Sequence, residues 1–105
     1  METPDFLPLG SIVNVKGNTK KMMIIARGLG IKQEGILKYY DYGACLYPEG
    51  MVGDTLMYFN HNGIQRVFFE GFSDDDNLMH LETLTENLRD STIEKGDPKP
   101  LQIPG

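Results

Sequence analysis

Apolar and polar residues alternate in short segments over the first 72 positions, and glycine-rich turns separate these segments. Residues 9–16 (LGSIVNVK) are rich in β-branched side chains and end at Gly17-Asn18, which predicts a strand. Residues 22–27 (MMIIAR) form a short apolar run closed by Gly28-Leu29-Gly30, typical of a buried central strand. The turn between the two segments predicts that they form a hairpin.

Three further segments have the composition of strands. Residues 35–48 (GILKYYDYGACLYP) are dense in tyrosine, and we expect a bulge or bend at Gly43. Residues 55–59 (TLMYF) fit either a fourth strand or a short helix. Asn62-Gly63 is a strong turn signal, and residues 64–72 (IQRVFFEGF) follow it as the last strand.

The chain changes character at residue 73. Ser73 is the expected N-cap of a helix, with Asp76 three residues on as in a capping box. Apolar residues then recur at spacings of three and four and predict one apolar stripe, with the helix ending between residues 88 and 93. The stripe consists of Leu78, Leu81, Leu84 (or Thr85) and Leu88.

These elements predict an α+β fold, an antiparallel sheet of four or five strands with one C-terminal helix packed on it. A chain of 105 residues is long enough for one domain, which we place at residues 1–93. Residues 94–105 hold three prolines and are expected to be an extended, mobile tail.

Charge and apolar run length limit the partners. The net charge is −5, with +3 over residues 1–40 and −8 over residues 41–105, which argues against nucleic acid as a partner. The longest apolar run, residues 22–26, is far too short to cross a bilayer, and the chain opens without a charged-then-apolar leader. The single Cys45 excludes an internal disulfide framework. We therefore expect a cytoplasmic protein without membrane insertion.

Motifs for catalysis or cofactor binding are weak. The glycines at 28, 30 and 35 do not make a dinucleotide loop, because Gln33 stands where the third glycine belongs. The acidic residues 74–76 could contact a cation, but a helix start explains them better. Cys45 would need His61 or His80 beside it to act as a nucleophile, and a buried structural thiol is the alternative. We expect no catalytic residue, metal or cofactor.

The tyrosine-rich segment is the leading candidate for a protein-binding site. Alternation on a strand places Tyr40 and Tyr42 on one side and Tyr39 and Asp41 on the other. One side must pack on the helix, and the other is expected to be open to a partner; the alternative is that both sides are covered. The candidate protein-binding residues are Tyr39, Tyr40, Asp41, Tyr42, Tyr47, Pro48, Glu49 and Gly50.

Two further surfaces are open to a partner. The polar face of the predicted helix could receive a basic partner, unless it is simply a solvated face; it carries Asp75, Glu82, Glu86 and Asp90. An unpaired strand at the edge of the sheet could pair with a second copy of the chain and form a homodimer.

The chain resembles a domain family of formerly unknown function encoded beside type VII (Esx-type) secretion systems of Gram-positive bacteria. The resemblance spans about residues 7 to 85 and is most specific at the Tyr-Pro-Glu-Gly segment. It is carried by residues 7–13 (LPLGSIV), 20–28 (KKMMIIARG), 40–42 (YDY) and 45–50 (CLYPEG), with the later Phe59-Asn60, Ile64, Val67-Phe68-Phe69 and Gly71-Phe72.

The resemblance implies a cytosolic chaperone or targeting factor that binds a secreted LXG-type toxin before export, and we expect no enzymatic activity. An immunity protein that neutralises such a toxin is the alternative in the same binding class. A small enzyme that uses Cys45 is the alternative from another class.

Overall fold

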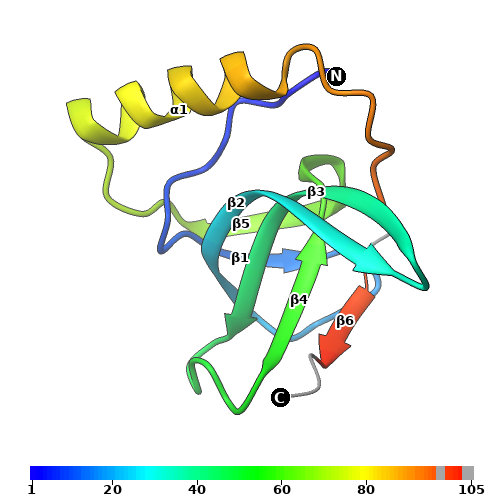
Figure 1. Cartoon of the computed structure of the whole chain (residues 1–105). Helices are drawn as coiled ribbons and strands as arrows, with labels where there is room; N and C mark the ends of the chain where they lie inside the picture. The colour runs from blue at the N-terminus through cyan, green and yellow to red at the C-terminus, as the bar shows by residue number, and fades with distance from the viewer. Residues whose placement is uncertain (97–98, 103–105) are drawn as a thin grey trace.

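A computed structural model describes residues 1–96 and the backbone of residues 99–102, and it confirms the α+β fold (Figure 1). The sheet is antiparallel, in the order β5-β1-β2-β3-β4-β6. Its strands are β1 (Ile12–Val15), β2 (Met22–Gln33), β3 (Ile36–Leu46), β4 (Thr55–Phe59), β5 (Ile64–Phe69) and β6 (Lys99–Gln102). A 3-10 turn, η1 (His61–Gly63), joins β4 to β5, and one helix, α1 (Asp75–Leu88), follows.

The first five strands are those predicted from the sequence, and the segment that fitted strand or helix is strand β4. The sixth, β6, comes from the tail and pairs with β4. The edge strands are thus β5 and β6. Pairing between β5 and β1 contains two register shifts, and such bulges blunt an edge. Homodimerisation through an edge stays a prediction.

The sheet is strongly curled, so that β1 and β5 cross behind β3 and β4 in Figure 1. The curl coincides with a bulge at Ile25 of β2, opposite Ala44 and Gly43 of β3. The bulge predicted in β3 therefore lies on the neighbouring strand. Gly43 is needed for another reason: a Cβ there would lie 2.8 Å from Cδ1 of Leu29.

Strand β2 runs further than predicted, because the glycines at 28 and 30 do not end it. It continues to a two-residue turn at Glu34-Gly35, where both residues have positive φ (53° and 79°), as a tight hairpin requires. Gly28 has a packing role instead: a Cβ there would lie 2.7 Å from Cδ1 of Leu84 on α1.

Helix α1 lies over the curled sheet, and the N-terminal segment (residues 1–8) passes beneath it (Figure 1). The Met1 ammonium donates to the carbonyl oxygen of Arg89 at 2.8 Å, so this segment starts at the end of the helix. Phe6 and Leu7 belong to the buried core, and α1 adds only partly buried leucines to it. Those leucines are Leu81, Leu84 and Leu88.

The helix start differs by one residue from the prediction. Asp74 is the N-cap, and its carboxylate accepts a hydrogen bond from the Asn77 N–H at 3.1 Å. The Ser73 hydroxyl accepts instead from the Asn77 side-chain amide at 2.9 Å. The prediction that Ser73 caps the helix together with Asp76 is therefore wrong. Ser73 and Asp74 are both good N-cap residues, and the sequence alone does not show which of the two caps the helix.

The segment assigned to the tail begins with residues hydrogen-bonded to the domain. Tyr39 donates its N–H to the Glu94 carbonyl and accepts from the Gly96 N–H, both at 2.8 Å. The Asn60 side chain donates to the Gly96 carbonyl at 2.8 Å. Where the tail is described it is extended, and the tail predictions for residues 97, 98 and 103–105 lie outside the described residues.

Candidate functional site

The predicted tyrosine site is not an open surface. Tyr39, Tyr40, Asp41 and Tyr42 have relative exposures of 2%, 0%, 1% and 0%. The expectation of an open side was wrong, and the alternative, that both sides are covered, is correct.

Tyr42 is covered by the core and by the N-terminal segment. Its ring lies edge-on to Phe6, with centroids 5.9 Å apart, and 5.6 Å from the ring of Phe59. Its hydroxyl accepts from the Leu7 N–H at 2.9 Å and lies 2.7 Å from Nδ1 of His61. Burial raises the pKa of Tyr42 to about 12. This phenol is a structural group that ties the N-terminal segment to η1.

Residues 94–96 cover the other tyrosines. Lys95 Nζ lies 5.9 Å from the centroid of the Tyr39 ring and 3.6 Å from an Asp41 carboxylate oxygen. Gly96 packs so closely on the Tyr40 ring that a Cβ would overlap it. The cover thus comes from the segment that the sequence predicted to be a mobile tail.

Asp41 organises the neighbouring turn. Its carboxylate accepts from the His61 N–H at 2.8 Å, and its own N–H donates to the Asn60 side chain at 3.0 Å. Burial, and then the nearby Asp41 carboxylate, raise the pKa of the Tyr39 phenol. These contacts hold β3 and η1 together.

The second half of the predicted site, Tyr47 to Gly50, remains accessible. Tyr47 is 41% exposed in a turn whose Tyr47–Pro48 peptide is cis. The Lys20 ammonium donates to Glu49 at 2.8 Å, and this hydrogen bond lowers the pKa of Glu49. Gly50 has a φ of 80°, so it serves the turn. Of the eight predicted residues, the four of the Tyr39 to Tyr42 segment are therefore buried in β3, and the other four lie in the turn that follows β3.

Cys45 is buried, which agrees with the alternative that its thiol is structural. The part of the chain that the structure describes contains no group of three His, Cys, Asp or Glu residues placed to hold a metal ion. Its helix is not long and apolar enough to cross a membrane.

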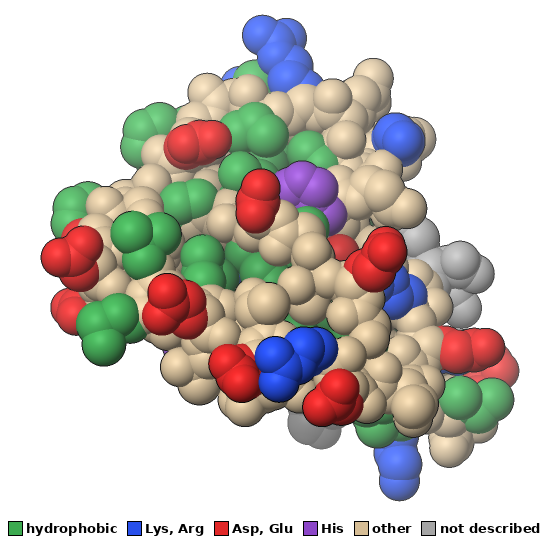
Figure 2. Space-filling view, turned by 90° about the horizontal axis from the view of Figure 1, so that it is seen from above, with side chains coloured by type: hydrophobic (Ala, Val, Ile, Leu, Met, Phe, Trp, Pro, Cys, Tyr) green, Lys and Arg blue, Asp and Glu red, His purple; other side chains and the backbone are tan. Residues whose placement is uncertain are grey.

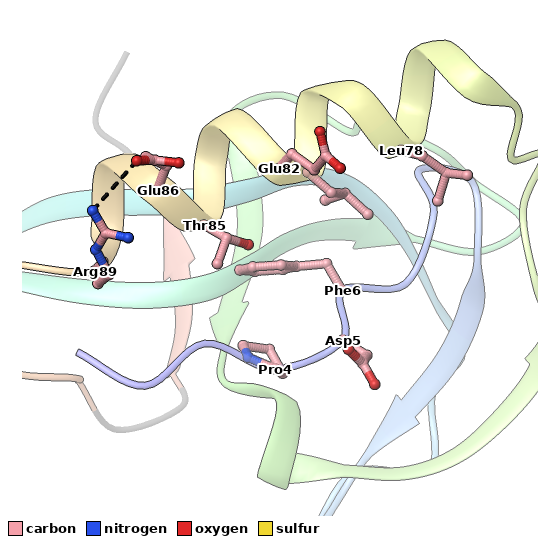
Figure 3. A pocket seen from close by; sticks show the side chains of 9 residues that line it. Pro4, Asp5, Phe6, Leu78, Glu82, Thr85, Glu86 and Arg89 are labelled. Carbon is pink, nitrogen blue, oxygen red and sulfur yellow. Dashed lines mark hydrogen bonds and ion pairs between the residues drawn. The ribbon is translucent and has the colours of Figure 1, made fainter.

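Two grooves flank α1, and we call the surface that they form the α1 surface. The first groove lies between the N-terminal segment and the helix and encloses about 850 Å³ (Figure 3). It is lined by Pro4, Asp5, Phe6, Leu78, Leu81, Glu82, Thr85, Glu86 and Arg89. The second lies between β2 and the start of α1 and encloses about 600 Å³. It is lined by Leu9, Ile25, Ala26, Arg27, Phe72, Asp74, Asp76, Asn77 and His80.

Large apolar side chains are open to solvent on the α1 surface. Phe72, Leu78 and Leu9, which line the two grooves, are 80%, 56% and 47% exposed. Figure 2 shows apolar side chains lying between scattered carboxylates on the face that carries the helix. An apolar patch with a charged rim is typical of a protein interaction site.

The fold fixes these groups in place. The Gly71 N–H donates to the buried Ser11 hydroxyl at 2.9 Å, and a Cβ at Gly71 would collide with the Leu9 carbonyl oxygen. Phe72 follows this close contact directly and is exposed. Arg27 donates to the Asn77 side chain at 2.7 Å and to the Leu7 carbonyl at 3.3 Å, and burial lowers its pKa. Arg27 thus joins β2, α1 and the N-terminal segment.

Sequence reasoning found only part of this surface. Glu82 and Glu86, predicted on the polar face of the helix, do line the first groove. Phe72 was taken as the last residue of a strand, and Leu78 as part of the buried stripe. The groove was missed because its second wall, residues 4–6, has no periodic pattern.

Residues 6–79 match the family model described as Domain of unknown function (DUF4176). The chain belongs to this family. The match runs from the buried Phe6 through β5 into the first turn of α1, and it includes Phe72, Leu78 and Met79. No curated protein and no solved structure matches the chain.

Proposed function

We propose that this DUF4176 domain is a non-catalytic cytosolic chaperone or adaptor that binds an LXG-type toxin before export by a type VII secretion system. The sequence resemblance described above supports the secretion setting. The observation that carries protein binding is the exposure of Phe72 and Leu78, which line the two grooves of the α1 surface. Covering such side chains removes apolar area from water, which favours association by about 25 cal/mol per Å² before the costs of binding.

The negative charge that lines the two grooves favours a basic partner. The carboxylates of Asp76, Glu82 and Glu86 line the two grooves, so an acidic partner is repelled and a basic one attracted. A toxin segment that combines apolar and basic side chains fits this surface.

Co-expression of the full chain with an LXG-type toxin from a type VII locus, followed by size exclusion, tests the proposal. Wild type should co-elute with the toxin. Phe72→Ser with Leu78→Ser should weaken capture at least tenfold, because it removes the two most exposed of the apolar side chains that line the grooves. The matched control is Phe69→Ser with Val52→Ser, two exposed apolar residues outside both grooves, which should capture as wild type. Absence of a complex with wild type would contradict the proposal.

The phenotype separates the adaptor from an immunity protein. Cells that lack an adaptor fail to export the toxin and survive, whereas cells that lack an immunity protein are poisoned by it. Cys45→Ser should leave both capture and export unchanged, since the thiol is buried. Loss of function in that variant, with folding intact, would favour a Cys-dependent enzyme instead.

A further inference from the structure

We propose that the first groove, between the N-terminal segment and α1, binds an amphipathic helix with basic flanks, supplied by the partner. This inference rests on the proposed function and names the kind of segment that the α1 surface receives.

The shape of the groove favours a helical occupant. Its helix wall is formed by residues 78, 81, 82, 85, 86 and 89, whose spacing of three to four places them on one face of α1. This stripe extends over about 16 Å at 1.5 Å per residue, or three helical turns. In Figure 3 the Phe6 ring extends from the opposite wall along the underside of the helix, below Thr85. Such a groove suits anchors spaced i, i+3, i+4 and i+7.

Backbone chemistry also favours a helix over an extended segment. A strand bound to a protein normally pairs its N–H and C=O groups with a strand edge. One wall of this groove is α1, whose backbone groups are already used within the helix. A helix satisfies its own backbone and needs only side-chain contacts from the groove.

The charge of the groove selects basic flanks. Glu82 and Glu86 stand on the helix wall, and Asp5 on the other wall points away from α1 in Figure 3. Among the described residues that line this groove, the one cation is Arg89, which is already paired with Glu86 at 3.3 Å. Lysine or arginine beside the apolar stripe of an incoming helix would therefore meet opposite charge.

A synthetic peptide tests the groove without any toxin. The probe is a 15-residue helix with leucine at i, i+3, i+4 and i+7 and lysine on both flanks, and fluorescence anisotropy measures its Kd for the full chain. Glu82→Lys with Glu86→Lys should raise the Kd at least tenfold. Glu34→Lys with Asp54→Lys changes the net charge equally, away from α1, and should raise it less than twofold. Equal effects of the two double variants, or no binding to wild type, would overturn the inference.

The same variants distinguish this inference from the proposed function. If wild type captures the toxin and Glu82→Lys with Glu86→Lys captures it equally well, the function stands and the groove is wrong. If the peptide binds the groove as described but no LXG-type toxin is captured, the groove stands and the proposed function is wrong.

Discussion

Single side chains explain why the tyrosine segment is a structural feature. The Tyr42 hydroxyl satisfies the N–H of a buried residue, Leu7, and the ring nitrogen of His61 at once. An aromatic ring with a polar tip suits this position, where an apolar core meets two polar groups.

Tyr42→Phe should lower the free energy of unfolding by about 1–3 kcal/mol, because it leaves the Leu7 N–H buried without an acceptor. Urea unfolding measures the change. Tyr47→Phe is the control: its ring is in the exposed turn, and the change should stay within about 0.5 kcal/mol. Equal losses in the two variants would contradict the role given to Tyr42.

The raised pKa of Tyr42 makes stability depend on alkaline pH. A tyrosine in the unfolded chain ionises near pH 10, whereas burial raises the folded value to about 12. The stability that this pKa difference contributes is fully present below pH 10. It is lost as the pH rises toward 12, because in this range only the unfolded state releases the proton. Urea unfolding between pH 8 and pH 11 should show this fall, and Tyr42→Phe should reduce its slope. An unchanged slope would show that Tyr42 ionises alike in both states.

The sequence predicts the strand that carries Tyr39 to Tyr42 correctly, but not the burial of these residues. The strand follows from local composition, whereas exposure depends on what else packs there. For Tyr39 and Tyr40 that cover is Lys95 and Gly96, more than 50 residues away in the chain. Composition and spacing carry no signal for such a contact.

Among the elements, α1 is the one whose prediction was most nearly complete. Its end at Leu88 agrees with the structure, and Leu81, Leu84 and Leu88 pack on the core as expected. Leu78 does not pack there and remains exposed. Periodicity identifies an apolar face, but it does not say how much of that face the rest of the chain covers.

The position of the cap can be tested directly. Asp74→Ala should lower the free energy of unfolding by about 1 kcal/mol, because its carboxylate accepts from the Asn77 N–H. Ser73→Ala removes only a hydrogen bond from the Asn77 side chain and should cost less than half as much. Urea unfolding followed by circular dichroism measures both. A larger loss in Ser73→Ala would restore the cap predicted from sequence.

In the molecule as a whole, both ends of the chain complete the sheet domain. Residues 1–8 pass beneath α1, and residues 94–96 cover the tyrosines of β3. Neither segment has strong periodicity, so the sequence indicated the sheet and helix but not these two covers.

Deletion of residues 94–105 should therefore destabilise the domain more than deletion of residues 97–105. Only the longer deletion removes the hydrogen bonds to Tyr39 and Asn60 and uncovers the Tyr40 ring. Urea unfolding and binding of an apolar dye measure the two effects. Equal stability of the two truncated chains would support a domain that is complete at residue 93.

Hydrogen–deuterium exchange of the chain with and without its co-purified toxin tests the central claim, that the α1 surface is where the partner binds. Binding should slow exchange in residues 1–9 and 72–89, and leave residues 47–52 and β5 unchanged. Slower exchange at the Tyr47 to Gly50 turn or along β5, with none around α1, would contradict the account.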